Sequence, residues 1–137
     1  FISSDHGGYE LKEKIIHFLN DNKLNVSNLG TNLNESVDYP DFCKKLVNEL
    51  RKNKDAFGVL ICGTGIGMSI AANRYKHIRA ALCTDDEMAL LSRKHNDANV
   101  LILGGRTTSF KSAKKMINIF LKTSFDSGRH TLRLKKI

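Results

Sequence analysis

A cysteine followed by three alternating glycines is the stretch of this sequence best suited to chemistry. Cys62 opens the run Cys-Gly-Thr-Gly-Ile-Gly, which ends at Gly67. The apolar residues 57–61 before it predict a buried strand, and the spacing of residues 66–75 predicts a helix after it. Glycines at such a turn leave backbone N–H groups open to a ligand, and a helix start favours negative charge. A thiol facing those donors should lose its proton more easily, because the thiolate gains from the same dipoles.

Two simpler interpretations of this stretch stay open. Cysteine is among the most buried residue types and often packs as a small hydrophobe. The glycines can also form a nucleotide-binding loop, since Asp85 or Asp86 follows at a distance suited to a ribose-binding acid. However, no Gly-Lys-Ser/Thr follows, and Met68 stands where the last glycine of Gly-x-Gly-x-x-Gly belongs. A Rossmann-type nucleotide-binding protein is therefore the weaker alternative.

Length and composition indicate one ordinary globular domain over residues 1–137. The chain is 41% hydrophobic and 26% charged, and no apolar run approaches the length of a membrane span. Three cysteines without a Cys-x-x-Cys pair predict free thiols in a reducing cytoplasm. The histidines show no metal-ligand spacing, so we expect no metal site and no membrane partner. Because Phe1 lies within an apparent strand and is not a methionine, we also expect that a few residues precede it.

The positive charge of the chain bears on which kind of partner it can bind. The net charge of +8 permits an anionic partner, which can be nucleic acid or a small phosphorylated substrate. No pattern of interleaved aromatic and basic residues supports nucleic acid, so we expect none. Much of the lysine is typical of a solvated helix face, and the segment 126–137 forms a basic tail.

Alternating strand and helix signals predict the fold class. The expected strands lie at about 1–4, 25–29, 57–61, 79–83 and 100–103. This order predicts an α/β protein, a three-layer α/β/α sandwich with a five-stranded parallel Rossmann-like sheet. Because crossovers are right-handed, the loops that follow strands open at one edge, where Asp5, Cys62 and Arg106 would meet. His95 and Asn96 instead lead into a strand, so within one subunit they should lie at the opposite edge.

Motifs spread over the whole chain match one known family in order and spacing. They are Asp5-His-Gly-Gly8, Asp38-Tyr-Pro40, Cys62-Gly-Thr-Gly-Ile-Gly67, Ile70-Ala-Ala-Asn73, Ser92-Arg-Lys-His-Asn-Asp97, Gly104-Gly-Arg106 and Gly128-Arg-His-Thr-Leu-Arg133. The chain resembles ribose-5-phosphate isomerase type B, in the family that also holds the galactose-6-phosphate isomerase subunits. The resemblance implies an aldose-ketose isomerase of the pentose phosphate pathway. It would interconvert ribose 5-phosphate and ribulose 5-phosphate through a cis-enediolate, without metal or organic cofactor.

The resemblance also implies roles for single residues. Cys62 would be the base that moves a proton from C2 to C1, Thr64 its partner for hydroxyl protons, and His95 the group that opens the furanose ring. Some relatives carry a glutamate base at the position of Ile66, so this chain resembles the cysteine type. The substrate-binding residues would be Asp5, His6, Tyr39, Gly63, Gly65, Ile66, Gly67, Asn96, Arg106, Arg129 and Arg133. In that set the histidine and the arginines would hold the phosphate.

Other expectations concern the substrate and the assembly. An isomerase of allose or galactose 6-phosphate is the alternative within the same family. Taken alone, Asp5 can merely cap a helix, and Arg129 and Arg133 can belong to a solvated tail. If His95 acts beside Cys62, the simplest geometry takes it from a two-fold partner. The resemblance points the same way, so we expect a homodimer, or a tetramer, whose active sites are shared across the interface.

Overall fold

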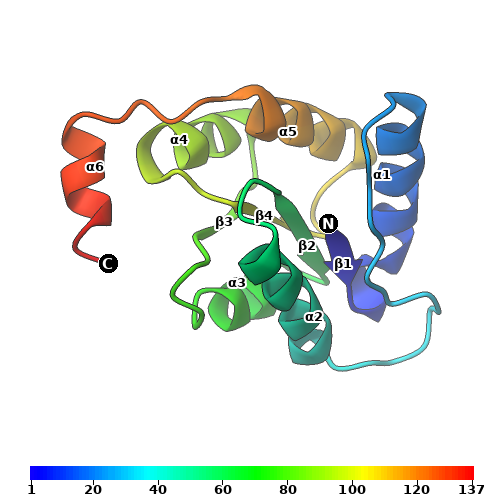
Figure 1. Ribbon diagram of the computed structural model, residues 1–137. Coiled ribbons are helices and arrows are strands. Elements are labelled where there is room, and N and C mark those ends of the chain that lie inside the picture. The colour runs from blue at the N-terminus through cyan, green and yellow to red at the C-terminus, as the bar shows by residue number, and fades with distance from the viewer.

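The computed structural model describes residues 1–137 and shows a parallel sheet between two layers of helices (Figure 1). The strands are β1 (Ile2–Ser4), β2 (Gly58–Cys62), β3 (Ala80–Leu82) and β4 (Val100–Gly104). They lie in the order β1-β2-β4-β3, and every neighbouring pair is parallel. The two longest strands are central, and their register pairs Cys62 with Gly104. Both strands therefore end at the same edge of the sheet.

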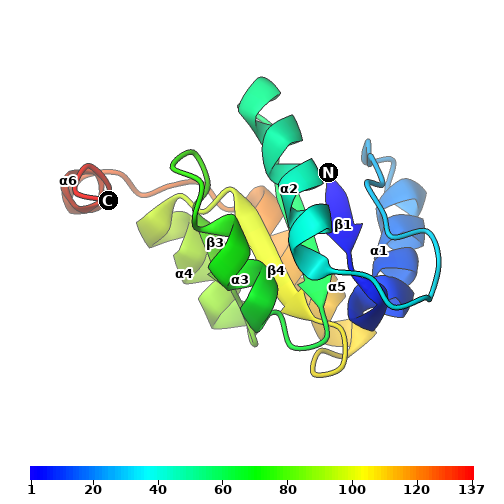
Figure 2. The ribbon, with the colours of Figure 1, turned by 90° about the horizontal axis from the view of Figure 1, so that it is seen from below.

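Helices cover both faces of this sheet, as the two perpendicular views show (Figures 1 and 2). One face carries α1 (Tyr9–Asp21), α4 (Asp86–Asn96) and α5 (Phe110–Lys122). The other carries α2 (Tyr39–Lys52) and α3 (Ile66–Ala72). A 3-10 turn, η1 (His6–Gly8), precedes α1, and α6 (Arg129–Leu134) lies beside α4 away from the sheet. The α/β class and the layered arrangement predicted from the sequence are confirmed.

The helix starts follow from their capping residues. Asp85 Oδ1 accepts from the backbone N–H of Met88 at 2.8 Å, and Ser109 Oγ accepts from that of Ser112 at 3.1 Å. Each bond satisfies an N–H group that has no partner inside the helix. Pro40 lies in the first turn of α2, where its missing N–H costs nothing. Each of these three helices therefore begins at a residue suited to a helix start.

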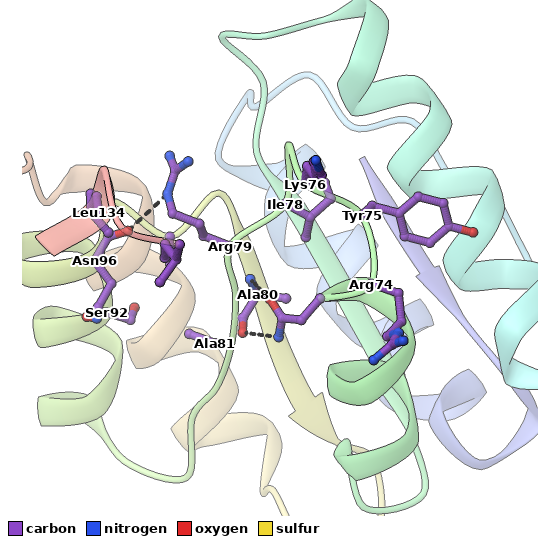
Figure 3. A pocket seen from close by; sticks show the side chains of 13 residues that line it. Arg74, Tyr75, Lys76, Ile78, Arg79, Ala80, Ala81, Ser92, Asn96 and Leu134 are labelled. Atoms are coloured by element: carbon purple, nitrogen blue, oxygen red, sulfur yellow. Dashed lines mark hydrogen bonds between the residues drawn. The ribbon is translucent and has the colours of Figure 1, made fainter.

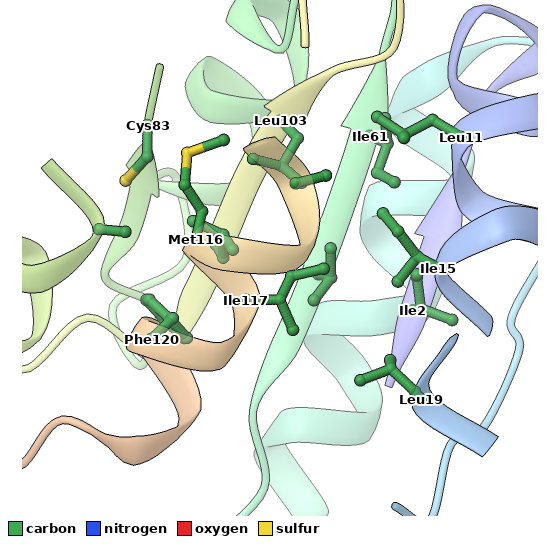
Figure 4. Close-up of a cluster of buried hydrophobic side chains, with 14 of the residues drawn as sticks. Ile2, Leu11, Ile15, Leu19, Ile61, Cys83, Leu103, Met116, Ile117 and Phe120 are labelled. Carbon is green, nitrogen blue, oxygen red and sulfur yellow. The ribbon is translucent and has the colours of Figure 1, made fainter. Parts of the chain in front are cut away.

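The alternation of side chains along the central strands produces two separate cores. Val59 and Ile61 of β2 point toward α1 and α5, where they meet a cluster of buried residues (Figure 4). Leu60 and Cys62 point to the opposite face and pack with α2 and α3. Since successive side chains of a strand face opposite sides, both faces of β2 are apolar. The side chain of Cys62 therefore lies on the face of the sheet that α2 and α3 cover.

The sheet has four strands, so the expectation of five was wrong. The segment expected as a strand at 25–29 forms one isolated bridge, between Ile2 and Asn28. It does run along β1, since Ile2 N donates to Ser27 O at 3.0 Å and Thr31 N donates to Ser4 O at 2.8 Å. The regular ladder stops because Gly30 has a φ of +106°, outside the range of a strand. The segment therefore stays beside β1 as an irregular strap.

Candidate active site

The loop between β2 and α3 brings the thiol of Cys62 against a backbone donor. The N–H of Gly65 donates to Cys62 Sγ at 3.2 Å, and Cys62 is only 5% exposed. Gly65 has a φ of +81°, and a Cβ there would lie 2.5 Å from Leu82 Cδ1. Only glycine fits this position, because its neighbours leave no space and the left-handed conformation disfavours other residues. The sequence run of alternating glycines is thus the means by which the sulfur obtains its donor.

The other two cysteines have different surroundings. Burial raises the pKa of both the Cys43 thiol and the Cys83 thiol to about 11. Cys83 Sγ faces the carbonyl oxygen of Ala81 at 3.6 Å, which accepts a hydrogen and cannot stabilise a thiolate. Cys62 is distinguished by the amide donor on its sulfur. All three are free thiols.

Three loops that follow strands lie in contact at this edge. Gly105 N donates to Cys62 O at 2.8 Å, and Arg106 N donates to Gly63 O at 3.0 Å. A Cβ on Gly105 would lie 2.3 Å from the carbonyl oxygen of Gly7, so the loops after β1 and β4 approach closely. The sequence prediction that these loops share one edge is confirmed. The two hydrogen bonds hold the start of the glycine loop against the loop that follows β4.

Arg106 and His6 line a cavity of about 290 Å³ next to this loop, together with Glu10 and Asn34. A Cβ on Gly63 would lie 3.4–3.5 Å from three atoms of the Arg106 guanidinium, so the planar group covers the glycine loop of its own chain. Arg106 therefore needs no partner subunit to reach this loop. Because guanidinium groups bind phosphate through several parallel donors, the cavity is suited to an anion. Sequence reasoning missed Glu10 and Asn34, which lie outside the recognised motifs.

The orientation of His6 follows from one backbone contact. Val37 N donates to His6 Nδ1 at 3.3 Å. In the neutral ring the proton must then be on Nε2, which becomes a donor. Asp5, directly before it, is 7% exposed and accepts from Gly8 N at 3.1 Å. This is the helix-capping contact that sequence analysis kept as the simple alternative for Asp5.

Tyr39 and Thr64 complete this edge. A Cβ on Gly67 would lie 2.8 Å from Tyr39 Cζ, so the phenol ring rests on the first turn of α3. Thr64 is exposed, and its Oγ1 accepts from Ile66 N at 3.4 Å. Ile66 itself is 55% exposed. These residues of the predicted set surround Cys62, within the same chain.

His95 and Asn96 lie at the opposite edge of the sheet, as the topology predicted. Arg79, just before β3, donates from Nε to the carbonyl oxygen of Asn96 at 3.0 Å (Figure 3). Arg79 and Asn96 line a hollow of about 640 Å³, and Leu134 and Ile137 line it from the tail. The side chain of Asn73 donates from Nδ2 to the carbonyl oxygen of Ala80 and accepts at Oδ1 from its N–H, at 2.9 Å each. These two bonds satisfy the backbone of Ala80 on the outer side of β3. The hollow thus lies beside an edge strand.

The predicted basic residues of the tail gather near His95. The rings of His95 and His130 stack in parallel, with centroids 4.2 Å apart. Arg129 and Arg133 are exposed on α6 and four residues apart, which puts them on one face of the helix. Burial lowers the pKa of His130, and the positive charge of His95, Arg129 and Arg133 lowers it further. Nothing in the sequence indicated a role for His130, although it lies between the two arginines in a recognised motif.

The predicted site residues therefore form two groups in one chain. The first group surrounds Cys62, and the second, at the other edge, consists of His95, Asn96, Arg129 and Arg133. No group of three or more His, Cys, Asp or Glu side chains is placed to hold a metal ion. No helix combines the length and the apolar character needed to cross a bilayer.

Comparison with known proteins relates this geometry to a family. A putative sugar phosphate isomerase of Rickettsia bellii is 51% identical over 136 residues, which is 99% of this chain and 94% of the relative. The crystal structure of a ribose 5-phosphate isomerase from Thermotoga maritima superposes with a TM-score of 0.97 at 51% identity, over 98% of this chain and 93% of the other. Ribose-5-phosphate isomerase B from Mycoplasma genitalium, solved with bound ribulose-5-phosphate, gives a TM-score of 0.95 at 42% identity, over 99% and 91%.

The match to a family model extends over the whole chain. The model is that of the ribose/galactose isomerases, and it covers residues 1–137. It therefore includes the glycine loop of Cys62 and the basic tail with Arg129 and Arg133. Together with the identities above, this places the chain in a family without recourse to any single motif. The chain belongs to the ribose/galactose isomerase family.

Proposed function

We propose that the protein interconverts ribose 5-phosphate and ribulose 5-phosphate, with Cys62 as the enolising base. The observation that carries the proposal is the amide of Gly65 on Cys62 Sγ at 3.2 Å, next to a cavity suited to phosphate. The bound ribulose-5-phosphate of the Mycoplasma genitalium relative supports the choice of substrate. Three free thiols and a phosphorylated substrate support a reducing cytoplasm as the compartment.

The reaction then divides between the residues of the two groups. His95 transfers the protons that open the furanose ring to the free aldehyde. The Cys62 thiolate takes the proton from C2, the C–H electron pair forms the C1=C2 bond, and the former carbonyl oxygen O1 becomes negative. Thr64 moves a proton between the hydroxyl oxygens of this cis-enediolate. The thiol then returns its proton to C1, and the product carries its carbonyl at C2.

The backbone of the glycine loop stabilises the charge that develops. N–H groups of residues 63–68 can supply the donors, as the N–H of Gly65 does for Cys62 Sγ, and each preorganised donor of this kind is typically worth about 3 kcal/mol. The positioned base contributes roughly 10²- to 10⁴-fold in rate. His6 and Arg106, with Arg129 and Arg133, hold the phosphate and so keep C2 next to the sulfur. Asp5, Tyr39 and Asn96 contact the sugar.

We also propose that two subunits share each site, because one chain separates the required groups. Cys62 ends β2, whereas His95 and Asn96 lie where β3 and β4 begin. Ile66 and Ile70, one turn apart on α3, are 55% and 63% exposed, and Leu132 and Ile137 of the tail are 64% and 89% exposed. Apolar side chains this exposed favour coverage by another protein surface. A two-fold partner covers them and brings its own His95 to Cys62.

Replacement of Cys62 tests the chemical part of this proposal. In Cys62→Ala, kcat for ribose 5-phosphate should fall by at least about 10²- to 10⁴-fold, the contribution of a positioned base. Calorimetric titration should show that this variant still binds ribose 5-phosphate, since the phosphate groups are intact. Cys43→Ala, at a buried thiol of α2, is the matched control and should keep wild-type kcat. An active Cys62→Ala enzyme would exclude the cysteine mechanism.

A further inference from the structure

Lys12 of α1 is a buried charge that the mechanism above does not use. Its side chain has no exposed surface, and it is among the largest fully buried side chains in the molecule. Lysine is almost never fully buried, because removal of an ammonium group from water costs several kcal/mol per ion. Such a cost is sustained only where the ammonium is paired and hydrogen-bonded. The contacts of Lys12 therefore indicate what the charge does.

One contact of Lys12 leaves its own helix. Its Nζ pairs with the carboxylate of Glu13 and lies 5.3 Å from the centre of the Tyr9 ring, both on α1. Its remaining hydrogen bond goes to Asn28 Oδ1, at 3.1 Å. Asn28 belongs to the irregular strap beside β1. Lys12 thus joins the start of α1 to the strap.

Asn28 is the centre of a small network inside the strap. Its Oδ1 also accepts from Gly30 N at 3.0 Å, and its Nδ2 donates to Asn32 Oδ1 at 3.3 Å. Gly30 O in turn accepts from Ser4 N at 2.7 Å, just before Asp5 and His6. Residues 29–37 form no helix or strand, so these side-chain bonds add to the few backbone bonds that hold the strap to Ile2 and Ser4 of β1.

The strap continues through residues 29–37, and its far end contacts His6 of the proposed phosphate site. Val37 N donates to His6 Nδ1 at 3.3 Å, and Asn34 lines the cavity that His6 and Arg106 share. The position of the strap therefore decides which nitrogen of His6 carries the proton in the neutral ring. With Nδ1 occupied by Val37, Nε2–H is the donor left for an anion.

We propose that Lys12 is a positioning residue for the phosphate side of the active site. Through Asn28 it holds the strap, and the strap holds His6 as the Nε2–H tautomer. The effect of Lys12 on catalysis rests on the proposed isomerase function, whereas its effect on the tautomer does not. A buried ion pair is weak evidence for stability, and an apolar replacement of similar volume is often neutral or stabilising. This charge is therefore explained better by position than by stability.

The test replaces Lys12 by methionine, which keeps the length of the side chain and removes its donors. Glu13 is 37% exposed and Asn28 is exposed, so both can bond water in the variant, and the thermal midpoint should stay close to that of the wild type. Lys14→Met, an exposed lysine of the same helix, is the matched control. Both variants and the wild type are compared by ¹⁵N NMR of the His6 ring above its titration range, and by steady-state kinetics.

Lys12→Met should convert His6 from the Nε2–H form to a mixture of both tautomers. It should raise KM for ribose 5-phosphate about 5- to 10-fold, the equivalent of one neutral hydrogen bond, with kcat changed less than KM. Inhibition by inorganic phosphate should weaken by the same factor. Lys14→Met should change none of these quantities.

An unchanged tautomer and an unchanged KM in folded Lys12→Met would overturn the proposal. If that variant does not fold, Asn28→Ala breaks the same connection at an exposed residue, and an unchanged His6 tautomer there overturns it equally. If the wild type shows no activity on ribose 5-phosphate, the proposed function fails, and the tautomer comparison alone decides the role of Lys12.

Discussion

The two edges of the sheet differ in what holds their functional groups in place. At the Cys62 edge, backbone hydrogen bonds and close glycine contacts fix three loops, and the thiol is buried. At the His95 edge, the groups are side chains at the ends of α4 and on α6, and both arginines of the tail are exposed. Enolisation depends on donors that do not reorganise, which the first edge supplies. The second edge carries the exposed groups that, in the proposed dimer, act in the site of the partner subunit.

Ion pairs and ring stacking add to the backbone contacts at the His95 edge. Asp97 accepts from Arg79 and from Arg93, at 2.8 Å each, and so fixes the end of α4 just after His95. His130 stacks on His95, and Asp126 N donates to Lys94 O at 3.0 Å. The tail is therefore attached to α4 and to little else. In the proposed dimer, the subunit that supplies His95 from α4 therefore also supplies Arg129 and Arg133 from α6.

The largest expected effect comes from mixing variants of the two edges. Cys62→Ala and His95→Ala should each be nearly inactive, because each removes one of the two groups that the shared site requires. After subunit exchange, a heterodimer holds one site with both lesions and one with neither. Random mixing makes about half of the dimers hetero, so about a quarter of wild-type activity should return. Initial rates on ribose 5-phosphate measure the recovery.

The controls for this mixing experiment address exchange and background. Ring opening is partly spontaneous, so His95→Ala should be assayed at short times. Native mass spectrometry of one isotope-labelled variant verifies that the subunits exchange. If the subunits exchange but activity does not return, the whole site lies within one chain. The two edges would then not contribute to different subunits' sites.

A smaller effect is expected from the arginines of the tail. Arg133→Ala should raise KM for ribose 5-phosphate about 10- to 100-fold, since a hydrogen bond to a charged group is worth about 1.5–3 kcal/mol. Arg106→Ala, at the other edge, should raise KM by a similar factor if both arginines bind one phosphate. Lys135→Ala, an exposed residue of the same tail, should keep the wild-type KM in the same assay. If Arg133→Ala keeps the wild-type KM, the tail does not bind the phosphate and is only a solvated basic surface.

The smallest expected effect is the contribution of His130 to the way the stability of the protein changes with pH. Its pKa in the folded protein lies below the ordinary value of 6.5, chiefly because the ring is buried. Above 6.5 both folded and unfolded states leave it neutral, and its contribution to stability is fully present. As the pH falls below 6.5 the unfolded state binds the extra proton first, so stability decreases toward the folded pKa. Thermal unfolding as a function of pH should show a weaker decrease in His130→Phe, and an identical decrease would contradict this assignment.

The sequence already determined most of the Cys62 edge. Its glycine spacing lies within one short loop, and loops that follow parallel strands must meet at one edge, so Asp5, Cys62 and Arg106 were placed together correctly. The capping contacts of Asp85 and Ser109 are equally local, since each joins residues three positions apart. The strap was not predictable in this way. A strand pattern at 25–29 says nothing of the φ of Gly30, which stops the ladder.

Contacts between side chains distant in the chain required the tertiary structure. Nothing in the sequence pairs His95 with His130, or brings Lys12 to Asn28, because such contacts depend on how helices pack and not on spacing within one element. The opposite placement of Cys62 and His95 followed from strand direction alone. The sequence by itself thus determined the chemistry of the glycine loop and the edge on which each group lies, since both are local or topological. Only the tertiary structure decided which side chains meet, because packing and desolvation act between segments far apart in the chain.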